Sequence, residues 1–482
     1  MKVIAMVDTH SLEHGALKKG RGSRFLRLLL KIVAGLVALI ILGALGLRLA
    51  FFAEPAPAPE RIAANAITWQ TSIAAISDLD QAAAGYANGQ LGLLPGQSDQ
   101  IAILAGPQPA TTATVAVSNS VIGWPTTARA SRDGRFLYVV EIRGQAPPGT
   151  QSITQPYVNF PKGNVLTVID TADRSAPRAI LRLPVGLNPS SVDVSADGAW
   201  LAVASDEATT GLFLWRLRDG LPVGEPQRFD IPFPRIGARL GLRSLRFHPQ
   251  LPFLAINLSD QQVAFYRLKH DGERARLTLH GQPVAPQLPN MVLTEVEWTP
   301  NGRNLLVPDV GWGDQSTPKM LTAKPGHLVS INFDGEATAR HRIANIATVG
   351  RSPEAMEISP DGRFAITVNM ERTYLPDMAV LRWIFGGSTA GSLSLITINP
   401  DGKLSAAPPV RFNALLPEDA LFDTDSRTLA LAVYERPSKA DGQGYVEFWR
   451  IAGDGPSARL VRGDHVARVA RGVHDLERLA VP

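Results

Sequence analysis

The sequence contains no cysteine among its 482 residues, and this absence removes several classes of function. Without a thiol the chain forms no disulfide, has no cysteine nucleophile or lipid-modified cysteine, and carries no covalently attached c-type haem. Charge is also scarce, because Lys, Arg, Asp and Glu make up 19% of the residues and the net charge is +4. Most of this excess lies in the first 31 residues, so we expect no nucleic-acid partner.

Long apolar runs are rare as well, with one exception near the N-terminus. Residues 32–47 are apolar or glycine throughout, and flanking Leu and Phe residues extend the run to the roughly 20 residues that cross a bilayer. Basic residues precede the run and "EPAPAPE" follows it, so the positive-inside rule places the N-terminus in the cytoplasm. The remainder is then periplasmic or extracellular. A cleaved signal peptide is the alternative.

A short unit recurs beyond residue 100, consisting of an apolar strand, a turn centred on Asp-Gly or its equivalent, and a second apolar strand. Asp-Gly pairs supply the positive φ that a tight turn needs, so each copy predicts a β-hairpin. Six copies are visible, over residues 128–141, 192–205, 245–258, 296–309, 356–369 and 420–433. Their turns lie about 58 residues apart, which suits one four-stranded propeller blade per repeat.

The two ends of the chain supply complementary halves of a seventh unit. Residues 472–481 resemble a lone inner strand, whereas 99–106 and 112–119 resemble outer strands without an inner partner. Residues 67–79 fit either another outer strand or a helix. Joining the ends closes a ring without an exposed edge, so we predict an all-β fold, a seven-bladed β-propeller. The predicted domains are a basic cytoplasmic tail (1–31), a transmembrane helix (32–52), a Pro/Ala linker (53–66) and the propeller (67–482).

Two of the repeats carry a family resemblance. "GLNPSSVDVSADGAWLAVAS" (186–205) and "GRSPEAMEISPDGRFAITVN" (350–369) resemble the YVTN and lactonase-like propellers, in which Gly-x-Pro-x-x precedes a Ser-Pro-Asp-Gly hairpin. The resemblance covers most of residues 100–482 and implies the same fold. Members of that family include gluconolactonase-type hydrolases and many proteins without an assigned reaction, so the resemblance implies activity less directly than fold.

Two polar columns stand at the start of the inner strands, where we expect the mouth of the central tunnel. The first column contains Thr126, Ser190, Arg243, Thr294, Glu354, Glu418 and His474. The second contains Thr127, Ser191, Ser244, Glu295, Ala355, Asp419 and Asp475. The candidate catalytic residues are Glu354, Glu418, Arg243 and His474, and the candidate ligand-binding residues here are Glu295, Asp419 and Asp475.

Four long loops are expected on the same face, and loops of such length are more often functional than accidental. They span residues 142–163, 310–326, 370–391 and 435–444. Within them, Trp312, Glu371, Arg372 and Tyr374 are candidate ligand contacts. The structural alternative is that Glu371 and Arg372 form a solvated ion pair while Tyr374 packs the loop down.

Three interpretations of Glu295, Glu354 and Glu418 stay open. As a group they suit a hard cation such as Ca²⁺, which prefers oxygen ligands. As a catalytic group they suit a general base for water attacking a lactone, with Arg243 stabilising the oxyanion and His474 shuttling protons. The third interpretation is hydrated mouth residues paired with nearby arginines. The sequence indicates no other cofactor, since it contains no zinc, nucleophile-elbow or Walker motif.

Two functions are compatible with this sequence. The first is a membrane-anchored, extracytoplasmic scaffold that binds an envelope protein or a glycan, because confinement at a membrane raises effective concentration. The second is a lactonase-like hydrolase that acts on a small lactone or sugar derivative at the tunnel mouth. The lack of a strong catalytic motif narrowly favours the scaffold, and whether the protein is an enzyme stays open.

Overall fold

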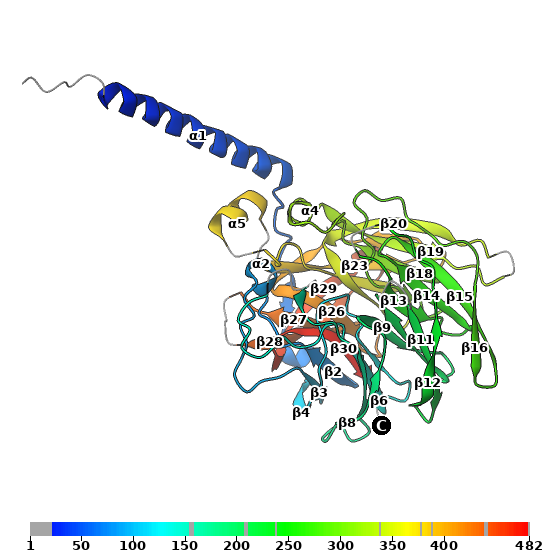
Figure 1. Ribbon diagram of the computed structural model, residues 1–482. Coiled ribbons are helices and arrows are strands. Elements are labelled where there is room, and N and C mark those ends of the chain that lie inside the picture. The colour runs from blue at the N-terminus through cyan, green and yellow to red at the C-terminus, as the bar shows by residue number, and fades with distance from the viewer. Residues whose placement is uncertain are drawn as a thin grey trace, which may run out of the picture. The chain divides into compact units, whose positions relative to one another are not determined.

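The computed structural model describes residues 22–153, 159–206, 211–236, 239–336, 339–375, 378–386, 389–437 and 442–480. Most of the tail predicted over residues 1–31 lies outside these ranges. The chain divides into two compact units, Met1–Phe52 and Ala53–Pro482. The described part of the first unit is the long helix α1 (Gly22–Phe51), and the second unit contains the strands (Figure 1).

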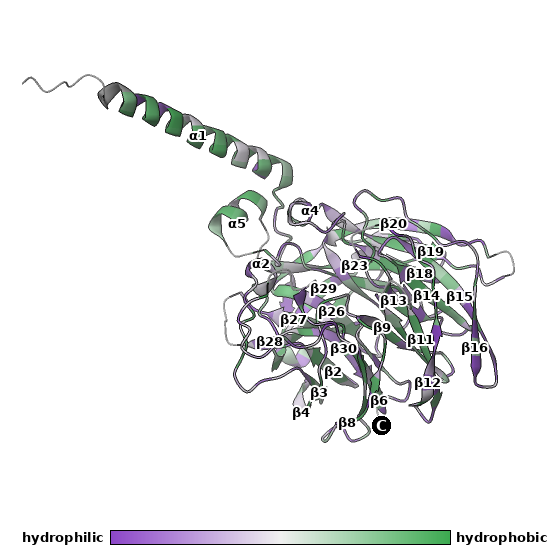
Figure 2. Ribbon diagram, in the orientation of Figure 1, coloured by the Kyte–Doolittle hydropathy of each residue, from purple (hydrophilic) through white to green (hydrophobic). Residues whose placement is uncertain are grey.

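Helix α1 contains the apolar run and begins ten residues before the predicted span. Its segment Phe25–Phe51 has 27 residues, none of them buried, and Figure 2 shows it as largely hydrophobic. At a rise of 1.5 Å per residue this segment is about 40 Å long, enough to cross a bilayer core of about 30 Å. By length and composition, α1 is therefore a candidate membrane span or signal anchor.

The second unit is a seven-bladed β-propeller, which confirms the predicted fold (Figure 1). Blade 1 contains β5 (Ala128–Ala130), β6 (Phe136–Val140), β7 (Val165–Asp170) and β8 (Arg178–Pro184). Blade 2 contains β9 (Pro189–Val194), β10 (Trp200–Ser205), β11 (Leu212–Arg218) and β12 (Leu221–Phe229). Blade 3 contains β13 (Leu242–Phe247), β14 (Phe253–Leu258), β15 (Gln262–Asp271) and β16 (Arg274–Leu279).

The next blades repeat this antiparallel order from the tunnel outwards. Blade 4 contains β17 (Glu297–Trp298), β18 (Asn304–Asp309), β19 (Pro325–Asn332) and β20 (Arg342–Arg351). Blade 5 contains β21 (Pro353–Ile358), β22 (Phe364–Asn369) and β23 (Ala390–Ile398), with β24 (Leu404–Ala406) and β25 (Val410–Asn413) both paired to β23. The short helices are η1 (Ala64–Ala66), α2 (Gly85–Asn88), α4 (Thr317–Leu321), α5 (Ala379–Phe385) and η2 (Gly455–Ser457).

Blade 6 takes a fifth strand from the segment predicted as linker. It contains β26 (Leu415–Phe422), β27 (Thr428–Glu435), β28 (Gln443–Ala452) and β29 (Arg459–Ala470). Strand β1 (Glu60–Ile62) pairs with β29 in parallel, and the Pro57 carbonyl accepts a hydrogen bond from Arg411 N at 2.9 Å. Part of the predicted spacer is thus bound to the propeller.

Blade 7 joins the two ends of the propeller, as the complementary half-units predicted. The inner strand is the C-terminal β30 (Val473–Leu479), followed outwards by β2 (Ser72–Ser77), β3 (Gln100–Ala105) and β4 (Ala110–Ala116). The strand alternative for residues 67–79 is therefore correct, because β2 lies within them and pairs with β30.

The repeated turn closes through one side-chain network. In blade 5, Ser359 Oγ donates to Asp361 Oδ1 at 2.7 Å, and the same oxygen accepts from Arg363 N at 3.0 Å. Gly362 has a φ of +71°, a conformation that glycine adopts without strain. Equivalent bonds form around Asp133, Asp197 and Asn301. The motif thus recurs because these blades join their first and second strands by the same turn.

Apolar side chains fill the spaces between neighbouring blades. Between blades 1 and 2, for example, Tyr138 and Val168 pack with Val203 and Phe213 in one buried cluster. The core is therefore divided among the spaces between blades, and the inner-strand side chains that face the tunnel are free to be polar.

Closure of the ring depends on Gly472, where the chain turns from β29 into β30. Gly472 has a φ of +79°, and its carbonyl accepts a hydrogen bond from Asp78 N at 3.0 Å. A Cβ added here would lie 1.7 Å from the Asp78 carbonyl oxygen. We expect Gly472→Ala to lower the free energy of unfolding, measured by urea titration, by about 3–5 kcal/mol.

Gly455→Ala is the matched control, because Gly455 also has a positive φ (+50°) but no atom within 4 Å of an added Cβ. This control should cost only the 1–2 kcal/mol or so of left-handed backbone strain. Equal losses in the two variants would contradict the steric role assigned to Gly472.

Candidate functional site

A hydrophobic lid covers the face that was expected to be an open mouth. Three of the four predicted loops meet there, through Phe160, Trp312 and Tyr374, together with Leu91 from the segment before β3. Beneath this lid cluster the first polar column is buried, with 0–7% of each residue exposed. The expectation of a hydrated mouth at this column is therefore wrong.

Trp312 and Tyr374 hold the lid together. Trp312 Nε1 donates to Ser352 Oγ at 2.9 Å, and the Tyr374 hydroxyl donates to the Met320 carbonyl at 2.9 Å. The two rings meet edge to face at 5.6 Å. Burial raises the pKa of Tyr374 to about 12. These contacts agree with the structural alternative for Tyr374.

Glu371 and Arg372 do not pair with each other, so the predicted ion pair between them is wrong. Glu371 instead lies 3.2 Å from Arg351 and accepts from Ser392 Oγ at 2.7 Å. Arg372 is 1% exposed and donates to the carbonyls of Leu321 at 3.0 Å and Phe385 at 2.7 Å. Burial lowers the pKa of Arg372 to about 10, which still leaves it charged at neutral pH. Arg372 therefore connects α4 to α5.

Arg243 and His474 are both engaged in buried contacts. Arg243 lies 2.7 Å from Asp206 and 3.3 Å from Asp260, so its charge is neutralised locally. His474 Nε2 lies 2.8 Å from Asn119 Oδ1, and burial lowers the pKa of this imidazole to about 3. A neutral, buried imidazole does not suit the proton shuttle that was expected.

Glu354 and Glu418 influence each other beneath the lid. Burial raises the pKa of Glu354 to about 8, against the attraction of Arg239. Burial and then repulsion by Glu354 raise the pKa of Glu418 well above its usual range. Burial therefore disfavours the charged form of both carboxyl groups, and their catalytic roles stay predictions.

The acids of the second column join neighbouring blades. Asp419 Oδ2 accepts from Leu476 N at 2.7 Å, Asp475 Oδ2 accepts from Ala128 N at 2.9 Å, and Glu295 accepts from Met356 N. In each case the N–H belongs to the inner strand of the next blade. Ser191 and Ser244 make the equivalent bonds to Leu245 N and Val296 N. These column residues therefore have a structural role whatever else they bind.

A separate acidic cluster lies at blade 7. Ligand oxygens of Asp78, Asp80 and Asp99 lie within 4.8 Å of one another, the one such group found among the described residues. Burial is the main cause that raises the pKa of Asp80 to about 7 and that of Asp99 to about 9. Glu295, Glu354 and Glu418 do not meet this distance, so the structure does not gather them into a cation site.

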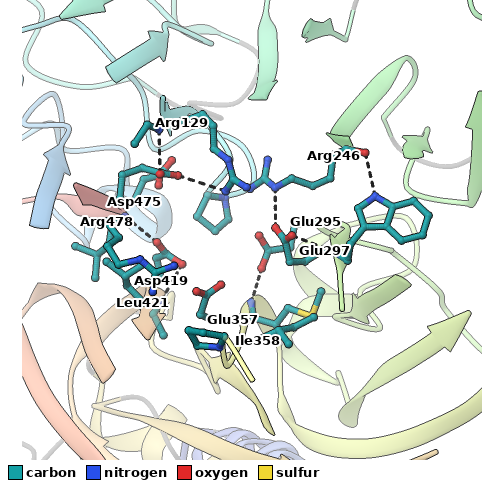
Figure 3. A pocket seen from close by; sticks show the side chains of 18 of the residues that line it. Arg129, Arg246, Glu295, Glu297, Glu357, Ile358, Asp419, Leu421, Asp475 and Arg478 are labelled. Atoms are coloured by element: carbon teal, nitrogen blue, oxygen red, sulfur yellow. Dashed lines mark hydrogen bonds and ion pairs between the residues drawn. The ribbon is translucent and has the colours of Figure 1, made fainter. Parts of the chain in front are cut away.

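A cavity opens on the opposite face, among the hairpin turns. This tunnel pocket has a volume of about 660 Å³ and extends inwards to Glu295, Asp419 and Asp475 (Figure 3). Its charged wall is a third column of inner-strand residues, two positions beyond the second. This tunnel ring consists of Arg129, Asp193, Arg246, Glu297, Glu357, Leu421 and Glu477, and all but Asp193 line the pocket.

Ion pairs occupy most of the charges in the tunnel ring. Arg129 Nε lies 2.8 Å from Asp193 Oδ1, and Arg246 Nε lies 2.8 Å from Glu297 Oε2. Glu477 accepts from Ala130 N at 3.0 Å. Glu357 differs, because within the described part of the chain no hydrogen bond or ion pair reaches its carboxylate. Burial and then repulsion by Glu297 raise the pKa of Glu357 to about 7, against the attraction of Arg478 and Arg129.

The tunnel ring was not predicted from the sequence, although each of its residues lies two positions beyond a residue of the second column. Strand side chains alternate between two faces, so a residue two positions along points the same way as the second column. Continuing from Glu295 to Glu297, or from Asp475 to Glu477, would have found the tunnel ring. The alternation of side chains along the inner strands was therefore sufficient to find these residues.

No protein-family model and no curated protein matches this sequence. The fold is similar to a periplasmic gluconolactonase of Pseudomonas aeruginosa, with 17% identity, a TM-score of 0.58, and coverage of 86% of this chain and 100% of the other. A Bacteroides fragilis protein assigned as a 6-phosphogluconolactonase gives 11% identity and a TM-score of 0.58, over 85% and 98% of the chains. A Lactobacillus plantarum protein is 14% identical, with a TM-score of 0.55 and coverage of 85% of this chain and 99% of the other. The chain thus has the fold of the lactonase-like seven-bladed propellers.

Proposed function

We propose that this protein is a hydrolase of small, sugar-derived lactones that works in the tunnel pocket. The observation that carries the proposal is Glu357, a pocket-lining carboxylate without a described bonding partner and with a pKa of about 7. Perturbed carboxylates in clefts are frequent at catalytic sites. The gluconolactonase with a similar fold supports this substrate class.

The pocket suits a polar ligand of monosaccharide size. Its volume of about 660 Å³ lies within the usual range for small-molecule sites. Glu297 and Glu477 can accept hydrogen bonds from sugar hydroxyls, and Arg129 and Arg478 supply positive charge near Glu357. The wall thus combines acceptors for a polyol with cations for an anionic intermediate.

Each residue then has a role in ester hydrolysis. Glu357 takes a proton from a water molecule, whose oxygen attacks the lactone carbonyl carbon. Arg478 and Arg129 stabilise the oxyanion that forms. When the ring C–O bond breaks, the proton passes from Glu357 to the leaving alkoxide, and the product is an open-chain hydroxy acid.

We also infer that α1 anchors the protein in a membrane with its N-terminus in the cytoplasm. The length and apolar composition of α1 support a span, and the basic residues that precede it support the orientation. The scaffold hypothesis, with an envelope protein or glycan partner, stays a prediction. The calcium ion also stays a prediction, for which the cluster of Asp78, Asp80 and Asp99 is the described acidic group.

Glu357→Gln should lower kcat for lactone hydrolysis by about 10²–10⁴-fold, because the amide cannot accept the proton from water. Turnover of a panel of sugar lactones by the full-length protein, with and without calcium, is the measurement. Asp401→Asn is the control, since Asp401 lies exposed in a hairpin outside the pocket. Loss of turnover in Glu354→Gln but not in Glu357→Gln would place the site beneath the lid instead.

The pH profile gives a second prediction. Only deprotonated Glu357 can act as a base, so kcat should rise with pH and reach half of its plateau near pH 7. Stopped assays between pH 5 and 9, corrected for spontaneous lactone hydrolysis, measure this profile. A rate that is flat across this range would exclude Glu357 as the base.

A further inference from the structure

Helix α5 exposes apolar side chains on the lid face of the propeller. Met378 is 50% exposed, Val380 51% and Trp383 44%, all within six residues of sequence. Ile384 and Phe385 on the same helix are buried and attach it to the propeller. Figure 2 shows α5 as largely hydrophobic. A cluster of exposed apolar residues with a tryptophan is typical of an interaction surface.

The position of α5 is fixed by a buried guanidinium. Arg372 donates to Phe385 at the end of α5 and to Leu321 at the end of α4. Arg382 on α5 and Lys319 on α4 are both exposed, and Lys324 follows α4 and is exposed as well. Three exposed cations therefore lie on or directly after the two helices that Arg372 joins.

Chain connectivity brings this surface close to the membrane anchor. The carbonyl of Phe385 also accepts a hydrogen bond from Ala53 N at 3.0 Å. Ala53 is only two residues beyond Phe51, the last residue of α1, and two residues of chain span at most about 7 Å. The chain is therefore bound to the end of α5 only two residues after the last residue of α1.

We propose that α5 is a second membrane contact, with Met378, Val380 and Trp383 entering the interface between lipid headgroups and acyl chains. Tryptophan is enriched at this depth, and basic side chains favour anionic lipid headgroups, here through Lys319, Lys324 and Arg382. The proposal rests on the anchoring by α1. Its consequence is that the propeller is held against the bilayer by two contacts and has a fixed orientation.

The absence of cysteine makes a direct test simple, because one introduced cysteine can be labelled uniquely. Three full-length variants are made, each with one cysteine that carries a nitroxide: Val380→Cys, Leu251→Cys and Ile40→Cys. Each is placed in vesicles of phosphatidylcholine and phosphatidylglycerol. Power saturation compares the access of oxygen, which enters lipid, with that of a water-soluble nickel chelate. Leu251 is the matched control, since it is 45% exposed but lies in the hairpin turn of blade 3, on the opposite face.

We expect the oxygen-to-nickel ratio at Val380 to exceed that at Leu251 several-fold and to fall below that at Ile40, in the middle of α1. If the ratio at Ile40 is high but the ratios at Val380 and Leu251 are equal and low, as in water, α5 does not contact the membrane. The proposed anchoring by α1 would then still hold. A water-like ratio at Ile40 would overturn both. Spectral broadening at Val380 that disappears on dilution with unlabelled protein would identify a second copy, and not lipid, as the occupant.

Discussion

The hydrogen bonds between the inner strands of neighbouring blades determine much of the rest of this structure. These strands converge on the tunnel but share no backbone ladder, so their free N–H groups need acceptors from side chains. Asp419, Asp475 and Glu295 supply such acceptors across three blade boundaries. The same bonds hold these carboxyl groups buried at the tunnel, where desolvation raises their pKa values. The acidic residues of the second column are thus explained in the first place by the hydrogen bonds that join the blades into a ring.

This constraint explains which candidate residues retain a free functional group. An acid whose oxygens bind backbone N–H groups of the next blade has a structural role, and an arginine that is paired within the wall has part of its charge neutralised. Glu357 has no such bond among the described residues, and the two arginines that attract it already have other partners: Arg129 pairs with Asp193, and Arg478 donates to the Phe422 carbonyl. The base that we propose is thus the carboxylate that ring closure leaves without a described bonding partner.

The fold could be predicted from the sequence because its signals are local. Asp361 and Gly362, for example, specify a turn by their own chemistry, and the terminal half-units differ visibly from the complete repeats. The site could not be predicted in the same way. Whether Arg372 faces a ligand or binds the Leu321 carbonyl depends on how two separate loops meet, and whether Glu354 is hydrated depends on the packing of the lid cluster. Both depend on contacts between segments far apart in sequence.

The two proposals are consistent in their geometry. Helices α4 and α5 belong to connections between the second and third strands of their blades, whereas the tunnel pocket opens among the connections between first and second strands. These connections lie on opposite faces because successive strands are antiparallel. A propeller that rests on the bilayer through α5 therefore turns the tunnel pocket towards water. A pocket lined by Arg129, Arg246 and Glu357 suits a soluble, hydroxyl-rich substrate arriving from that side.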